Sequence, residues 1–311
     1  MIINTGQRTD IPAFYPEWFM NRIKEGFVCV RNPFHAEQVS RYELNPDIVD
    51  CIGFCTKNPA PMLPYLNAIR AYGQFWYVTI TGYGTETEPN VPPYPEVIKS
   101  FQELSRTVGE NAVGWRYDPI FINGTYSIRY HLSCFETIAN ALSGYTHIAV
   151  ISFIDIFRKV TLNFPGVRPV TGDERRTLGK EMVSIAQKYG MELYPCGEGT
   201  ELEKYGANCG GCMTAPIYEK AIGCHLKLPK GKENRTECAC YLTCDIGQYD
   251  TCLHLCKYCY ANRDHALVKQ NHRLHDPNSP LLIGHLKEND QIHQADQVSF
   301  KDYQMKLSDF L

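Results

Sequence analysis

The chain has 311 residues, of which 44% are hydrophobic and 21% charged, as is ordinary for a globular protein. Its formal net charge of −3 excludes a global basic field that would attract nucleic acid. The sequence has no uninterrupted apolar run of transmembrane length, and its first ten residues lack the features of a signal peptide. We therefore expect a cytoplasmic protein with no membrane partner.

Short buried strands are predicted at seven places in the first 195 residues. These segments are rich in β-branched and aromatic residues and often stop at Pro, Gly or Asn. In chain order they are residues 1–6, 27–30, 50–56, 74–81, 112–118, 147–154 and 191–195. Segments of helical length and period lie between most of them, at 16–26, 61–73, 96–109, 128–144 and 172–190.

Strands that alternate with helices predict an α/β fold with a parallel sheet. Our first expectation is a TIM-like (βα) barrel, with or without a degenerate eighth unit, and the alternative is an open doubly wound sheet. Three regions are expected: a barrel domain at 1–195, a Cys-rich segment at 196–262, and a C-terminal tail at 263–311 that packs back on the barrel.

Fourteen cysteines are the unusual feature of the composition. Ten of them fall between Cys196 and Cys259. The other four lie in strand or helix patterns and are expected to be core residues: Cys29, Cys51, Cys55 and Cys134. A chain kept reduced uses dense thiols for metal more often than for disulfides, and thiolates favour zinc, copper(I) and iron–sulfur clusters.

The string TCLHLCKYCYAN places Cys252, Cys256 and Cys259 in a C-x3-C-x2-C arrangement. One loop of this spacing can wrap a [4Fe–4S] cluster, with each thiolate on a different iron. The remaining iron would take a remote cysteine, a substrate or a cofactor as its fourth ligand. The alternative is a structural zinc site, which needs four closed ligands.

This motif, with an aromatic residue just before its last cysteine, resembles that of the radical S-adenosylmethionine (SAM) superfamily. The longer string YDTCLHLCKYCYAN is similar to the spore photoproduct lyase branch. The resemblance implies that the three cysteines ligate a cluster, that the open iron binds SAM, and that electron transfer cleaves SAM to a 5′-deoxyadenosyl radical. It also implies that Tyr258 packs beside the adenine and that a reductase, flavodoxin or ferredoxin donates the electron.

Radical SAM enzymes carry the motif after their first strand, whereas here it follows the whole predicted barrel. The chain is identified as a member of a bacterial domain-of-unknown-function family with a radical-SAM-like cysteine cluster at its C-terminus. The segments that carry this identification are QRTDIPAFYPEWF, RNPF, TKNP, WRYDPI, ISFID, CDIGQYDTC and HLCKYCYAN. Membership of the family implies no particular reaction.

Further cysteines precede the motif and are candidates for a second metal site. The predicted ligands are Cys196, Cys212, Cys238 and Cys240, with Cys209 as a possible substitute. Cys196 follows the last predicted strand, where a barrel presents its functional groups. This site could hold a second cluster or zinc, and the alternative is that its members are buried or free thiols.

Polar side chains at the predicted carboxyl ends of the strands are candidates for catalysis. The predicted catalytic residues are Arg8, Asp10, Lys57, Arg116 and Asp118, and the predicted cofactor contacts are Arg31, Asn58 and Glu198 besides Tyr258. Gly197–Glu198 resembles the glycine–glutamate element that binds the SAM amino group. The cations predict either internal ion pairs, such as Arg8 with Asp10 and Arg116 with Asp118, or an anionic ligand.

A basic tract at residues 262–276 could suggest DNA, but we expect a solvated helix face and no nucleic-acid partner. The sequence therefore favours an iron–sulfur enzyme, radical-SAM-like, that acts on a small molecule at the barrel mouth, with anionic molecules among the candidates. Two other classes remain open. One is an iron–sulfur protein that transfers electrons or senses redox state without SAM, and the other is a zinc-stabilised hydrolase or binding module.

Overall fold

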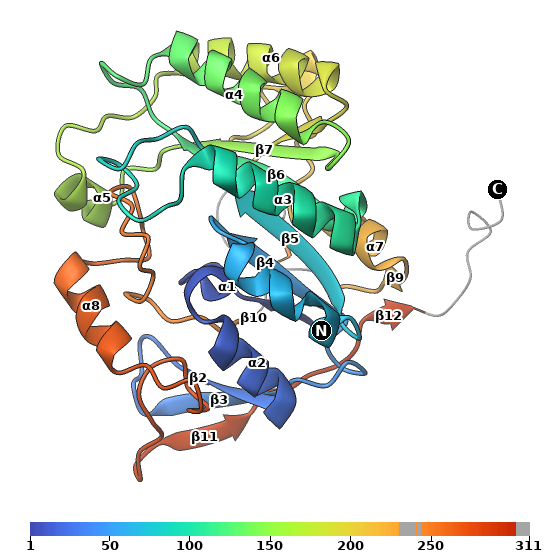
Figure 1. Cartoon of the computed structure of the whole chain (residues 1–311), viewed down its shortest axis with the longest axis vertical. Helices are drawn as coiled ribbons and strands as arrows, with labels where there is room; N and C mark the ends of the chain where they lie inside the picture. The colour runs from blue at the N-terminus through green and yellow to red at the C-terminus, as the bar shows by residue number, and fades with distance from the viewer. Residues whose placement is uncertain (230–239, 242–243, 303–311) are drawn as a thin grey trace.

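The computed structural model describes residues 1–229, 240–241 and 244–302. Seven of its strands form one parallel sheet, in the order β10-β1-β4-β5-β6-β7-β8. Their bounds are β1 Ile2–Asn4, β4 Cys51–Thr56, β5 Gly73–Thr79, β6 Val113–Ile120, β7 Ile148–Phe153, β8 Glu192–Pro195 and β10 Cys244–Asp245. The predicted α/β class with a parallel sheet is confirmed (Figure 1).

The strand order explains why the sheet resembles a barrel without being one. From β1 to β8 each new strand of the main sheet is added at the same edge. Right-handed crossovers then place the connecting helices on one face, unlike a doubly wound sheet, whose strand order reverses. Closure would require the two edge strands to pair, yet within the described residues no pairing joins β8 to β10. The sheet is therefore singly wound and open, and the expected closed barrel is not formed.

The predicted helices at 16–26, 96–109, 128–144 and 172–190 are confirmed as α2 (Pro16–Glu25), α3 (Tyr94–Val108), α4 (Ile128–Leu142) and α6 (Gly172–Lys188). The segment predicted at 61–73 is instead a 3₁₀ helix, η1 (Ala60–Ile69), in which Pro64 has no N–H for an α-helical bond. Shorter helices are α1 (Ile11–Phe14), α5 (Arg158–Asn163), α7 (Ala215–Ile222) and α8 (His265–Arg273), with 3₁₀ turns η2 (Glu110–Ala112) and η3 (Glu203–Tyr205). Among the described helices, none combines the length and apolarity that a membrane span requires.

The strand predicted at 27–30 forms but does not join the main sheet. It is β2 (Phe27–Arg31), which pairs antiparallel with β3 (Gln38–Glu43), and β3 pairs parallel with β11 (Gln291–Gln294) of the tail. The short connection 32–37 can only return the chain antiparallel, because a parallel crossover needs a longer segment. The seventh strand of the main sheet is β10, which comes from the Cys-rich segment. The strands β9 (His225–Leu226) and β12 (Lys301–Asp302) form a separate pair.

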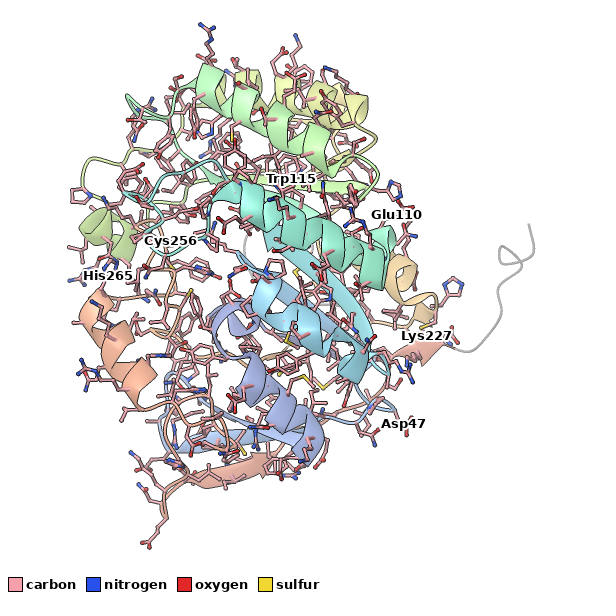
Figure 2. The ribbon with its side chains drawn as sticks, in the orientation of Figure 1. Asp47, Glu110, Trp115, Lys227, Cys256 and His265 are labelled. Atoms are coloured by element: carbon pink, nitrogen blue, oxygen red, sulfur yellow. The ribbon has the colours of Figure 1, made fainter. Side chains whose placement is uncertain are left out.

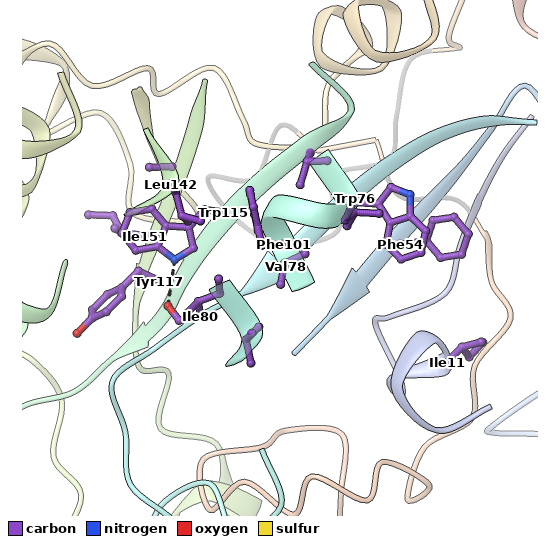
Figure 3. Packing of buried hydrophobic residues seen from close by; sticks show 14 of the residues in the cluster. Ile11, Phe54, Trp76, Val78, Ile80, Phe101, Trp115, Tyr117, Leu142 and Ile151 are labelled. Carbon is purple, nitrogen blue, oxygen red and sulfur yellow. Dashed lines mark hydrogen bonds between the residues drawn. The ribbon is translucent and has the colours of Figure 1, made fainter. Parts of the chain in front are cut away.

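The helix-covered face of the sheet holds the larger hydrophobic core (Figure 3). On this face Phe54 stacks on Trp76 with ring centroids 3.8 Å apart, and Phe101 of α3 packs into the same cluster. The indole N–H of Trp115 donates to the Ile80 carbonyl at 3.0 Å, which satisfies its one buried polar group. Burial of these aromatic side chains fixes the sheet against the helix layer.

The opposite face of the sheet carries a second, smaller cluster that includes Phe75, Tyr77 and Val150. Helix α7 covers it with Ile217 and Tyr218, and the cluster also includes cysteines of the Cys-rich segment. The Cys-rich segment is therefore packed on the sheet face that the crossover helices leave uncovered. This placement decides which side chains the cysteines meet.

Candidate cysteine-lined functional site

A cavity of about 520 Å³ lies at the carboxyl ends of the parallel strands. Residues that lie in five strands or directly follow them line its walls. They are Asp10 after β1, Cys55 and Lys57 at the end of β4, Arg116 and Asp118 in β6, Ser152 in β7, and Cys196 after β8. Figure 2 shows Cys256 towards the side where α5 and α8 lie, whereas Asp47 and Glu110, which precede β4 and β6, lie on the opposite side. The site thus occupies the edge at which parallel α/β sheets usually bind ligands.

Seven described cysteines line this one cavity. They are Cys55, Cys196, Cys212, Cys240, Cys252, Cys256 and Cys259. Six of them belong to the two metal sites that the sequence predicts. Of the other members considered for the second site, Cys209 does not line the cavity, and Cys238 lies outside the described residues. Cysteines as far apart in sequence as Cys55 and Cys259 therefore line the same cavity.

The loop that carries Cys252, Cys256 and Cys259 is hydrogen-bonded to the segment between β5 and α3. The side-chain amide of Asn90 donates to the Leu253 carbonyl at 2.7 Å, and the Lys257 N–H donates to the Thr87 carbonyl at 3.0 Å. Within the loop Leu255 has a φ of 57°, in the left-handed region that costs an L-residue roughly 1–2 kcal/mol. A conformation this costly persists because surrounding contacts fix it, and such residues cluster at functional sites.

Asp10 joins three parts of the site. One of its carboxylate oxygens accepts from Nε2 of His254 at 2.8 Å and from the Lys57 backbone N–H at 2.7 Å. The other accepts from the Ala13 N–H at 3.0 Å and so caps α1. Asp10 therefore connects the cysteine loop to the residue that follows β4. Among the described contacts Asp10 pairs with His254, and Arg8, considered as its partner in one of the two alternatives, lies over the Tyr249 ring at 5.6 Å.

Lys57 and Tyr258 meet on the buried carboxylate of Glu88. The Lys57 ammonium lies 2.9 Å from Glu88, Thr81 donates to the same oxygen at 2.9 Å, and the Tyr258 hydroxyl donates to it as well. Burial acts to lower the pKa of Lys57, but Glu88 and Cys256 outweigh it and raise that pKa above its ordinary value. Lys57 is therefore a fixed cation beside the cysteine loop.

Arg116 forms the predicted internal pair with Asp118, at 2.6 Å from Nη2 to the carboxylate. Ser152 donates to the other Asp118 oxygen at 2.6 Å, so that carboxylate is held from two sides. The Nη1 group of Arg116 points elsewhere and donates to Sγ of Cys212 at 3.4 Å. One guanidinium thus connects the ion pair to the second group of cysteines.

The second group of cysteines comes together around that guanidinium. The Sγ atoms of Cys212 and Cys240 are 3.4 Å apart, and Cys196 is in hydrogen-bonding range of both. Hydrogen bonds from those two thiols, with Arg116 nearby, lower the pKa of Cys196, while its neighbours raise that of Cys212. The three sulfurs and the Arg116 guanidinium therefore lie in one cluster of close polar contacts.

Cys55 is a member of the cavity wall that the sequence assigns to the core. It pairs in register with Tyr77 of β5, whose side chain lies in the smaller cluster, so Cys55 faces the same side. It interacts electrostatically with Arg116 and Cys212, and burial raises the pKa of its thiol to about 12. Its position at the carboxyl end of a predicted strand was a signal that could have placed it in the site.

Four predicted site residues do not line the cavity: Arg8, Arg31, Asn58 and Glu198. Arg31 belongs to the second sheet and pairs with Asp290 at 2.5 Å. Glu198 accepts from the Phe153 N–H at 2.8 Å and pairs with Arg175 at 2.9 Å, and burial raises its pKa to about 7. Arg31 and Glu198 thus make ion pairs within the protein.

The arrangement of the donor atoms bears on what the cavity could hold. Within the described ranges, no three His, Cys, Asp or Glu side chains are placed to hold a metal ion. A single zinc ion would need its ligand sulfurs about 2.3 Å from one point. A four-iron cluster instead fills a space, and each thiolate reaches a different iron. The Cys212 and Cys240 sulfurs, 3.4 Å apart, are too close together as placed to reach different irons of one cluster.

The fold and the site define an α/β protein with a cysteine-lined cavity at the carboxyl edge of a parallel sheet. The chain belongs to the family described as a domain of unknown function (DUF1848), whose model matches residues 2–261. The matched range includes every described cysteine that lines the cavity. No curated protein and no solved structure matches the chain.

Proposed function

We propose that this protein is an iron–sulfur enzyme of the radical-SAM type, which acts on a small molecule in the cavity. In this proposal Cys252, Cys256 and Cys259 hold a [4Fe–4S] cluster, and SAM completes the coordination of the fourth iron. When bound, the cluster would supply single electrons for the reductive cleavage of SAM. The electron would come from a reductase, a flavodoxin or a ferredoxin.

One observation carries the proposal. The cysteine loop follows all seven strands of the main sheet in sequence, yet it lies at the carboxyl edge of that sheet, and all three cysteines line one cavity. The position of the motif late in the chain is therefore compatible with a cluster placed over the strand ends. That is the edge at which singly wound (βα) folds bind substrates and cofactors.

The residues beside the loop have roles that follow from their contacts. Lys57 would offset part of the negative charge that the thiolates bring into a buried site. The Tyr258 ring, fixed through its hydroxyl to Glu88, offers a flat apolar surface to a bound base. A cavity of about 520 Å³ suits a small ligand, and its polar wall of Arg116, Asp118 and Ser152 would orient one.

The test uses protein purified without oxygen, reduced with dithionite and incubated with SAM. We expect 5′-deoxyadenosine to form and the EPR signal of the reduced cluster to change when SAM is added. The Cys256→Ala variant should lose both responses. The Cys134→Ala variant is the matched control, because Cys134 is a largely buried cysteine that does not line the cavity.

Other results would contradict the proposal in ways that can be told apart. A brown protein that neither cleaves SAM nor changes its EPR signal with SAM would support electron transfer or redox sensing instead. A colourless protein with stoichiometric zinc would support a zinc-stabilised hydrolase or binding module.

A further inference from the structure

We infer that Cys212 and Cys240 form a redox-active dithiol, which a small organic disulfide in the cavity oxidises to a Cys212–Cys240 disulfide bond. The dithiol would thereby reduce the small disulfide to two thiols. The inference does not rest on the proposed function, because this exchange needs neither an iron–sulfur cluster nor SAM.

The two sulfurs already lie in contact. Their Sγ atoms are 3.4 Å apart, and the two cysteines are present as thiols, not as a disulfide. A disulfide bond is about 2.05 Å long, so the sulfurs must approach each other by about 1.4 Å. Rotation of the two side chains can supply a movement of this size. The short spacing that does not suit ligands of different irons is therefore the spacing that bond formation needs.

Main-chain hydrogen bonds bring the two cysteines together from separate segments of the chain. The Tyr241 N–H, next to Cys240, donates to the Met213 carbonyl, next to Cys212, at 2.7 Å. The Cys212 carbonyl accepts from the buried Tyr77 hydroxyl. None of these bonds involves a sulfur, so they can hold the two cysteines side by side in the reduced and the oxidised state alike.

Arg116 distinguishes this pair from cysteines that only fill a core. An ordinary buried thiol packs as a small hydrophobe and needs no cation beside it. Here Nη2 of Arg116 pairs with Asp118, while Nη1 donates to Sγ of Cys212 at 3.4 Å. The thiolate is the form that attacks a disulfide, and a neighbouring arginine favours it. The pair therefore has the electropositive setting that is typical of reactive cysteines.

The pair also borders a space in which a small molecule can bind. Cys212 and Cys240 line the cavity of about 520 Å³, together with the apolar residues Met213, Phe153 and Ile154. Small-molecule sites combine such apolar walls with a few polar groups that fix orientation. A small organic disulfide, with an apolar S–S bond and short polar ends, matches this lining.

The exchange balances in atoms and electrons. One sulfur of the pair attacks a sulfur of the small disulfide, whose S–S bond breaks and whose other half leaves as a thiol. The second cysteine sulfur then attacks the mixed disulfide, so that the Cys212–Cys240 bond forms and the second small thiol leaves. The pair loses two electrons and two protons, and the two small thiols carry them away.

The experiment treats anaerobically purified wild type with 2-hydroxyethyl disulfide, quenches the reaction with acid and alkylates the remaining thiols. Proteolysis and tandem mass spectrometry should then find Cys212 linked to Cys240. About two molecules of 2-mercaptoethanol should be released for each link, as two exchange steps require. Excess dithiothreitol should break the link and restore both thiols.

Cys212→Ser and Cys240→Ser should each lose the rapid release of two molecules of 2-mercaptoethanol. Cys51→Ser is the matched control, because Cys51 is buried in the same hydrophobic cluster as Cys212 but does not line the cavity. That variant should release as much as wild type. If the variants at the pair do not fold, the linked peptide from wild type still tests the inference.

Several results would overturn the inference. One is a wild type in which Cys212 and Cys240 remain thiols, and another is a link that joins either of them to a different cysteine. A link that forms with hydrogen peroxide but not with 2-hydroxyethyl disulfide would refute the assigned substrate class. One zinc per chain that Cys212→Ser removes would also count against a dithiol.

Failure of this inference and failure of the proposed function give different results. Loss of the SAM response in a protein that still forms the Cys212–Cys240 link would count against the proposed function alone. An intact SAM response in a protein that forms no link would count against the dithiol alone.

Discussion

His131 gives a stability prediction that does not involve any cofactor. Its ring is fully buried between two partners, the Phe121 carbonyl at 2.8 Å from Nε2 and the Tyr117 hydroxyl at 2.9 Å from Nδ1. A carbonyl only accepts, so Nε2 carries the proton of the neutral ring and Nδ1 accepts from the tyrosine. Burial lowers the pKa of His131 from 6.5 to about 4.

The sign of the pH effect follows from that direction. Between pH 6.5 and about 4 the unfolded chain binds a proton at His131 and the folded chain does not. Folding stability therefore falls as the pH is lowered through this window. A shift of this size corresponds to about 3 kcal/mol at 1.36 kcal/mol per pKa unit.

The assay compares urea unfolding of wild type and His131→Phe at pH 7 and pH 4. At pH 7 the variant should be less stable, because the Tyr117 hydroxyl and the Phe121 carbonyl lose their partner, at about 1–3 kcal/mol for each buried group. The difference between the two proteins should shrink by about 3 kcal/mol at pH 4. His285→Phe, at an exposed histidine, controls for loss of an imidazole. An unchanged difference at the two pH values would refute the reasoning.

Three further predictions test other contacts. Burial raises the pKa of Glu198 from 4.5 to about 7, so the free energy of unfolding of wild type should fall by up to about 3 kcal/mol as the pH rises through this range. In urea unfolding, the Glu198→Gln variant should not show this fall. Asp10→Asn should reduce iron retention and the melting temperature, because an amide cannot accept all the bonds of the carboxylate; exposed Asp47→Asn should change neither. Trp115→Phe should lower the free energy of unfolding by about 1–3 kcal/mol by leaving the Ile80 carbonyl unpaired, and a change under about 0.5 kcal/mol would contradict this.

The main secondary structure could be predicted because local patterns determine it. Helix α6 begins with a capping box formed by Thr171 and Glu174, and α2 ends at Gly26 in the left-handed conformation. The sheet that each strand joins was harder to predict. Nothing local in residues 27–30 reveals that β2 turns back on β3, and β10 is too short to give a periodic signal.

The candidate site could be predicted in part for a similar reason. Spacing alone singled out Cys252, Cys256 and Cys259 as candidates, because the pattern is local, and all three line the cavity. Placing Lys57 and Arg116 at strand ends also followed from the alternation of strands and helices. The partners of such residues depend on tertiary packing. The sequence therefore did not reveal that the Glu88 carboxylate accepts hydrogen bonds from Lys57 and Tyr258.

The most direct test of the account is the iron content of anaerobically purified wild type beside Cys256→Ala. The account predicts brown protein with about four irons per chain and matching sulfide, and almost no iron in the variant. Wild type without iron, or a variant that keeps all of it, would contradict the claim that the Cys252–Cys259 loop holds an iron–sulfur cluster.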